Sequence, residues 1–266
     1  DGVFRVLAPN PSPLTGEGTN SYVVTGPQGG SVIIDPGPAD EGHLVALADL
    51  ARRRGGTSAI LITHGHPDHL EGAPRLRELT NAPILAWSVE GSPHADRVVA
   101  DGEAVLPDGR ALRAIHTPGH RFDHLSFLLE DAGALFAGDH VAGRGTVVIA
   151  PPEGDLLDYM TSLERLRALD LRLILPGHGP VIDDPVALLD YYIAHRNERE
   201  QQVLAGLAAG PRTIAELVSG IYADVDPGLH GYAAMSVEAH LRKLAREGRV
   251  TSDAGDAQQA RWQILR

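Results

Sequence analysis

Short apolar runs alternate with amphipathic stretches over residues 1–180, and this alternation predicts a fold with both strands and helices. Turn-forming residues separate the runs, as Gly26-Pro27-Gln28-Gly29-Gly30 does between the first two. The runs predict strands over residues 21–25, 31–35, 83–87, 111–116, 125–130, 134–137, 146–149 and 172–175. Apolar positions at helical spacing predict helices over residues 41–54 and 155–168. Together they indicate an α+β fold in which outer helices cover two sheets.

The pattern changes after Gly179-Pro180, where residues 185–207 predict one long helix before the break at Gly210-Pro211. The remaining residues predict helices over 213–222 and 236–247, the second capped by Ser236, and a hairpin of 249–252 with 261–265. The order helix, helix, hairpin resembles a winged helix, and a small helical cap on the larger domain fits the spacing equally well. We therefore predict two domains, 1–209, which includes the long helix, and 210–266.

The hexapeptide His64-Gly65-His66-Pro67-Asp68-His69 directly follows the apolar run of residues 59–63. Three imidazoles and a carboxylate this close together are poor core fillers, whereas they are ordinary ligands of a divalent metal. In an extended segment His64 and His66 point the same way, because side chains alternate with a period of two. Pro67 suits a first helical turn, which would bring Asp68 and His69 back toward the same point. The segment predicts a metal site, and a solvated polar loop is the alternative.

Composition narrows the chemistry further. The 266 residues include no cysteine, which excludes disulfides, thiolate nucleophiles and thiolate ligands. No apolar run approaches the roughly 18 residues of a membrane span, and we expect a cytoplasmic protein with no membrane contact.

Residues 1–210 hold 16 Lys plus Arg against 28 Asp plus Glu, a net charge of −12, and residues 211–266 hold seven of each. This balance disfavours nucleic-acid binding. The basic cluster Arg242, Lys243, Arg246 and Arg249 is interpreted as a solvated face.

The hexapeptide resembles the first metal motif of the metallo-β-lactamase superfamily. Counterparts of the other three motifs follow in order as His116-Thr117-Pro118-Gly119-His120, Phe136-Ala137-Gly138-Asp139 and Leu175-Pro176-Gly177-His178-Gly179. Val32-Ile33-Ile34-Asp35-Pro36-Gly37 also resembles a family segment, in which Asp35 lies near the site without binding the metal. The resemblance implies the family's αββα sandwich, here with a small C-terminal winged-helix-like domain.

A set of seven ligands is implied by the resemblance. One metal would be held by His64, His66 and His120, a second by Asp68, His69 and His178, with Asp139 bridging them. Asp68 and Asp139 would also orient the attacking nucleophile. The metals are expected to be two zinc ions, with iron or manganese as alternatives.

The other histidines receive less specific interpretations. His120 is preferred to its neighbours His116 and His124 because it occupies the motif's position, and His124 is interpreted as an outer partner or a structural residue. His140 is left as either a pocket residue or a structural one. Surface or capping roles are expected for His43, His94, His195, His230 and His240.

The tail, together with the segments Asn10–Tyr22 and Gly143–Met160, is similar to the β-lactamase-like protein 2 branch of the superfamily. The resemblance implies a metal-dependent hydrolase, in which a hydroxide bridging two metals attacks an ester or thioester carbonyl of a small or carrier-linked acyl substrate. The main alternative is a single-stranded RNA endonuclease. An iron redox enzyme and a DNA-binding regulator are weaker alternatives, and a homodimer is among the expected assemblies.

Overall fold

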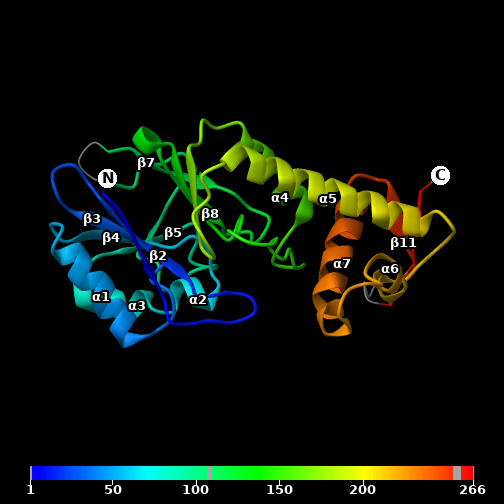
Figure 1. Cartoon of the computed structure of the whole chain (residues 1–266), viewed down its shortest axis with the longest axis horizontal. Helices are drawn as coiled ribbons and strands as arrows, with labels where there is room; N and C mark the ends of the chain where they lie inside the picture. Colours follow the sequence, from blue (N-terminus) through cyan, green and yellow to red (C-terminus); the bar gives the residue numbers. More distant parts are fainter. Residues whose placement is uncertain (1, 107–109, 254–258, 266) are drawn as a thin grey trace. The chain divides into compact units, whose positions relative to one another are not determined.

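A computed structural model of the chain describes residues 2–106, 110–253 and 259–265. Backbone contacts divide it into two compact units (Figure 1). The first unit comprises residues 1–118, 123–147 and 168–186, and the second comprises 119–122, 148–167 and 187–266. The domain boundary expected between residues 209 and 210 stays a prediction.

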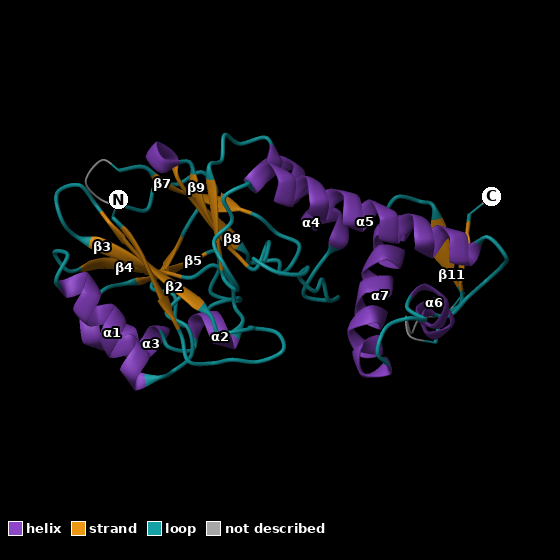
Figure 2. Cartoon of the chain, viewed as in Figure 1, coloured by secondary structure: helices purple, strands orange, loops and turns teal. Residues whose placement is uncertain are grey.

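The first unit contains two sheets, whose strands Figure 2 shows in orange. The larger has the order β1 to β6, with strands Val3–Leu7, Asn20–Thr25, Ser31–Ile34, Thr57–Leu61, Ile84–Ala86 and Arg97–Val98. The smaller has the order β10-β9-β8-β7, with β7 Leu112–His116, β8 Leu125–Leu129, β9 Ala134–Gly138 and β10 Leu173–Pro176. The β3, β4 and β5 strands run parallel, so their carboxyl ends meet at one edge.

The core of the first unit explains why its central strands are apolar on both faces. Val24, Val32 and Leu61 of the larger sheet share one buried cluster with Phe127 and Phe136 of the smaller sheet. Alternate residues of the larger sheet pack instead against α1 (Glu41–Arg52) and α3 (Ala73–Thr80), which cover its outer face (Figure 2). The expectation of two packed sheets with outer helices is confirmed for this unit.

The second unit contains α4 (Leu156–Arg167), α5 (Pro185–Leu207), α6 (Ile214–Ile221), the 3-10 turn η2 (Pro227–Leu229) and α7 (His230–Arg246). The β11 strand (Val250–Ser252) and β12 (Trp262–Ile264) form the antiparallel hairpin expected from the sequence. A capping box starts α6, because Thr213 and Glu216 each bond the other's backbone N–H. A buried apolar cluster joins α5, α6, α7 and the hairpin, which confirms the helix, helix, hairpin order.

Two expectations about local structure are wrong. Residues 146–149 form an irregular loop rather than a strand, although Ile149 is buried. An apolar run predicts that a segment is buried, but a strand forms only where a neighbouring strand is available to pair with it. The last long helix begins at His230 rather than Ser236, because η2 continues directly into α7 and Ser236 lies inside the helix. The sequence analysis also missed β1, β6 and α3.

Two histidines expected at the surface are instead buried. His43 lies in α1, where its Nε2 is 2.9 Å from Ser21 Oγ. His240 lies in α7 with 1% of its surface exposed, and neither ring nitrogen has a hydrogen-bond partner among the described residues. Burial, with the positive charges of Arg196 and Lys243, lowers the pKa of His240 to about 3. The ring is therefore neutral in the folded protein near pH 7.

This buried ring predicts acid sensitivity of the second unit. Below its ordinary pKa of 6.5, His240 takes up a proton only when the chain unfolds, so stability falls as pH falls from 6.5 toward 3. The expected loss is about 2 kcal/mol between pH 7 and pH 5. Urea unfolding followed by Trp262 fluorescence in a Trp87→Phe background would measure it. The His240→Leu variant should lose this part of the pH dependence, whereas His94→Leu, at an exposed position, should keep it. An unchanged slope in His240→Leu would contradict the assignment.

Candidate metal centre

The hexapeptide forms the turn that links β4 to α2 (Pro67–Leu70). Buried Ile62 and Thr63 follow the β4 strand, and the backbone bends at Thr63, directly before His64. Pro67 occupies the first helical position, and the His69 N–H donates to His66 O at 3.0 Å. The expected swing of Asp68 and His69 into a helical turn is confirmed.

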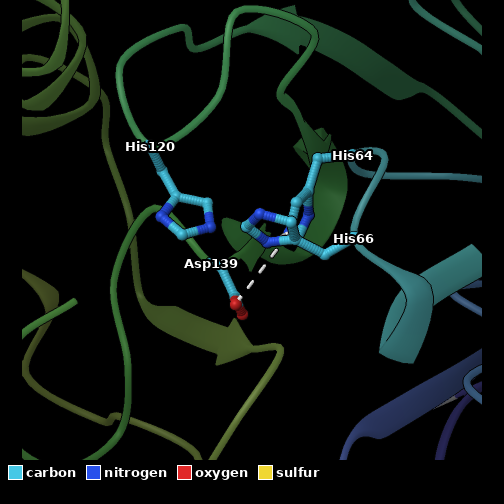
Figure 3. A group of neighbouring side chains, drawn as sticks. All are labelled: His64, His66, His120 and Asp139. Atoms are coloured by element: carbon cyan, nitrogen blue, oxygen red, sulfur yellow. Dashed lines mark hydrogen bonds and ion pairs between the residues drawn. The ribbon is translucent and has the colours of Figure 1, made fainter. Parts of the chain in front are cut away.

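One ligand atom from each of His64, His66, His120 and Asp139 lies within 4.8 Å of the others (Figure 3). His64 Nε2 is 2.9 Å from His66 Nδ1 and 3.9 Å from Asp139 Oδ2. His120 Nδ1 lies 2.9 Å from Val148 O. Three imidazole nitrogens and one carboxylate oxygen make up this first group.

A second group contains Asp68, His69 and His178, whose ligand atoms also lie within 4.8 Å of one another. His178 Nε2 is 3.2 Å from Asp68 Oδ2 and 3.3 Å from His69 Nε2. Asp139 reaches this group as well, since its carboxylate oxygens lie 3.4 Å from His69 Nε2 and 3.4 Å from His178 Nε2. Gly177 allows this approach, because a Cβ there would be 2.5 Å from Asp139 Oδ1. Asp139 is thus the side chain common to both groups.

Asp35 contacts His69 of the second group through the ring nitrogen that does not face the other ligands. Its Oδ2 lies 2.8 Å from His69 Nδ1 and accepts from Thr63 Oγ1 at 2.7 Å, while its Oδ1 accepts from the Thr63 N–H at 2.8 Å. The backbone of Asp35 has a φ of 51°, an uncommon conformation for a residue with a side chain. These hydrogen bonds offset that strain and orient His69 so that its Nε2 faces the cluster. Asp35 had been expected near the site, but Thr63 was missed because it lies in an apolar run.

The charges in the cluster stabilise one another. Burial alone would lower the pKa of His69, but the carboxylates of Asp139 and Asp35 hold that pKa well above its ordinary value. Burial alone would raise the pKa of Asp139, but His69 and His178 hold it well below its ordinary value. The Asp139 side chain is therefore ionised although only 14% of it is exposed. A buried anion among imidazoles is an arrangement suited to a cation.

The remaining sequence candidates lie around these groups. His124 is buried, with its Nδ1 2.8 Å from Thr117 Oγ1, and its Nε2 accepts from the Asp139 backbone N–H at 3.2 Å. The His116 ring stacks on Trp87 at 3.6 Å. Among the residues that the structure describes, both groups of candidate ligands omit His116, His124 and His140. The assignment of individual residues as metal ligands stays a prediction.

Comparisons with known proteins identify the family of this chain. A sequence profile of the metallo-β-lactamase superfamily matches residues 14–178, and one of the β-lactamase-associated winged helix domain matches residues 213–262. The chain is 36% identical over 257 residues to a β-lactamase-like protein 2 homolog of Caenorhabditis elegans, covering 93% of this chain and 85% of the relative. It is 34% identical over 261 residues to the atrochrysone carboxyl ACP thioesterase AgnL7 of Paecilomyces divaricatus, covering 93% and 81%.

Two solved structures extend the comparison. A metallo-β-lactamase family protein from Thermus thermophilus aligns with a TM-score of 0.80 and 25% identity, covering 99% of both chains. The di-iron-bound form of TTHA1623 aligns with a TM-score of 0.56 and 27% identity, covering 69% of this chain and 96% of that chain. The expected fold class, an α+β metallo-β-lactamase fold with a winged-helix domain, is confirmed. The chain therefore belongs to the metallo-β-lactamase superfamily of metal-dependent hydrolases, among relatives of β-lactamase-like protein 2.

Proposed function

We propose that this protein is a binuclear metal hydrolase that cleaves an ester or thioester bond of a small or carrier-linked acyl substrate. One observation carries the proposal, namely that two groups of imidazole and carboxylate donors share the side chain of Asp139. Nitrogen and oxygen donors of this kind suit zinc, with iron or manganese as alternatives. The di-iron-bound relative supports two metals in this fold and keeps iron as an alternative.

In this proposal His64, His66 and His120 would hold one metal and Asp68, His69 and His178 the other, and Asp139 would serve both groups. Divalent metals in such a site lower the pKa of water and stabilise negative charge on a substrate oxygen. Asp35 fixes the His69 ring, and the His124 ring fixes the backbone of Asp139. Asp68 keeps 29% of its side chain exposed, so its carboxylate remains open to accept a hydrogen bond from an attacking water.

Two observations favour an acyl substrate over RNA. The relative AgnL7 is named as a thioesterase. The basic cluster Arg242, Lys243, Arg246 and Arg249 is also paired with carboxylates of the second unit. Its ion pairs are Arg242–Glu238 at 2.7 Å, Lys243–Glu200 at 2.6 Å, Arg246–Asp155 at 2.6 Å and Arg249–Glu200 at 2.7 Å. These side chains therefore offer little unneutralised charge to a phosphate backbone.

We find no helix among the described residues with the length and hydropathy needed to cross a bilayer.

A substrate panel tests the proposal. Zinc-loaded protein would be assayed with acyl thioesters, lactones and labelled single-stranded RNA, and metal content would be measured on the same sample. We expect thioester or ester turnover that falls by about 10²- to 10³-fold in His66→Ala and is unchanged in His94→Ala, whose side chain is exposed. RNA cleavage that disappears in His66→Ala, without acyl turnover, would reject the proposed substrate class. A protein that retains only iron and hydrolyses none of these substrates would reject the proposed hydrolase.

A further inference from the structure

The loop between β1 and β2 holds Thr19 in one orientation. Thr19 is fully buried, and its N–H donates to Asn10 Oδ1 at 2.9 Å. Asn10 Nδ2 in turn donates to Thr19 Oγ1 at 3.0 Å. Because the Thr19 hydroxyl oxygen accepts from Asn10, its own hydrogen points elsewhere, and Asp68 Oδ2 lies 3.4 Å away as its acceptor. The amide of Asn10 therefore aims the Thr19 hydroxyl at Asp68.

The same segment supports His178. The Gly18 carbonyl oxygen accepts from His178 Nδ1 at 3.3 Å, which leaves Nε2 directed at Asp68. The Asn20 side chain donates to Pro176 O at 3.0 Å and to Gly179 O at 2.9 Å, on both sides of the histidine. Gly18 has a φ of 138°, and a Cβ there would lie 2.1 Å from the carbonyl oxygen of Ala8, so the loop needs glycine at this point.

These contacts reach two members of the same ligand group, Asp68 and His178. Asp68 is the most exposed of that group, so its carboxylate has the most freedom to rotate away. A hydrogen bond that restrains a ligating carboxylate removes part of the entropy cost of binding, and such outer contacts are typically worth 10- to 100-fold in metal affinity. Loss of the Thr19 hydroxyl should therefore weaken one metal more than the other.

We propose that Thr19, oriented by Asn10, is a positioning residue for Asp68 that sets the affinity of the metal held by Asp68, His69 and His178. The proposal rests on the binuclear function proposed above. Thr19 touches neither the substrate nor the metal in this role. It acts through the carboxylate of Asp68 alone.

Chelator titration of the metal-loaded protein tests the role. Wild type, Thr19→Val and Thr19→Ser would be dialysed against increasing chelator, and the metal retained per chain would be measured at each step. We expect wild type to release two metals in two steps. In Thr19→Val one step should shift by about 10- to 100-fold in free metal while the other stays in place. Thr19→Ser retains the hydroxyl and should restore most of the shifted step.

Thr25→Val is the matched control. Thr25 ends β2, and within the described part of the chain its buried Oγ1 makes no hydrogen bond, so this variant should release metal as wild type does. Asn10→Ala leaves Thr19 intact but frees its hydroxyl to rotate, and it should shift the same step in the same direction. This second variant keeps the test decisive where Thr19→Val lowers the thermal stability of the metal-free protein.

The outcomes separate this proposal from the function on which it rests. If wild type releases two metals, equal shifts of both release steps in Thr19→Val would overturn the positioning role. The absence of any shift in Thr19→Val would overturn it as well. A Thr19→Ser variant that behaves like Thr19→Val would also overturn it. A wild-type protein that holds fewer than two metals would overturn the binuclear proposal first, and the positioning role with it.

Discussion

Asp139→Ala is expected to reduce kcat/KM by about 10³-fold or more and to release metal, while the protein stays folded. The reason is geometric, because this carboxylate lies 3.4 Å from His69 and His178 and 3.9 Å from His64. Its removal takes a donor from both groups at once. Steady-state kinetics, metal content and circular dichroism on one sample would measure the three effects.

Asp49→Ala provides the matched control for this experiment. Asp49 of α1 has a half-exposed side chain that pairs with Arg52, so kinetics and metal content should match wild type. Two metals and undiminished turnover in Asp139→Ala would contradict the proposal of a shared carboxylate. A variant that loses only one metal yet keeps full turnover would contradict it as well.

Lys243→Met is expected to destabilise the second unit by about 3 kcal/mol. The Lys243 ammonium donates to Glu200 Oε2 at 2.6 Å and to Glu247 Oε1 at 2.7 Å, and both Lys243 and Glu200 are buried. Methionine keeps the apolar stem but leaves Glu200 with Arg249 as its remaining partner at 2.7 Å. Breaking a buried pair costs more than the pair contributes, because the charge left behind is poorly solvated. Urea unfolding monitored by Trp262 fluorescence in the Trp87→Phe background would measure the loss.

The same helix offers a comparison at its surface. Arg242 pairs with Glu238 with nearly half of its side chain exposed, so Arg242→Met should cost less than about 1 kcal/mol. The double variant Lys243→Met with Glu200→Gln should recover part of the loss, since it removes a buried carboxylate that has lost one of its two cationic partners. Equal costs for Lys243→Met and Arg242→Met would show that burial does not govern these pairs.

The sequence predicted the candidate centre better than it predicted the elements around it. Residues 64–69 can be recognised as a candidate metal site because imidazoles and carboxylates rarely cluster without a chemical reason. Pro67 also predicts the helical turn that follows. The long helix at 185–207 was also predicted to the residue, since its start at a proline and its polar pattern are local signals. The missed strand β6 is two residues long and exposed, so it carries no apolar pattern to read.

Burial of individual polar residues was predicted least well. His240 and His43 have the composition of surface histidines, and only the packing of α7 and α1 places them inside. Likewise, the sequence suggests a basic face made of Arg242, Lys243, Arg246 and Arg249. The carboxylate partners of these residues include Glu200 and Asp155, which lie far away along the chain. Partners at such separations leave no trace in local spacing.

By itself, the sequence determined the family, the order of the motifs and the residue types available to a metal, because each depends on short segments read in order. Only the tertiary structure decided which of these side chains meet. It brought Asp139 between His64 and His178, and it placed Asn10, Thr19 and Asp68 in one chain of hydrogen bonds. The physical reason is that sheet pairing and core packing bring distant segments together, and the position of a side chain in a site depends on those long-range contacts.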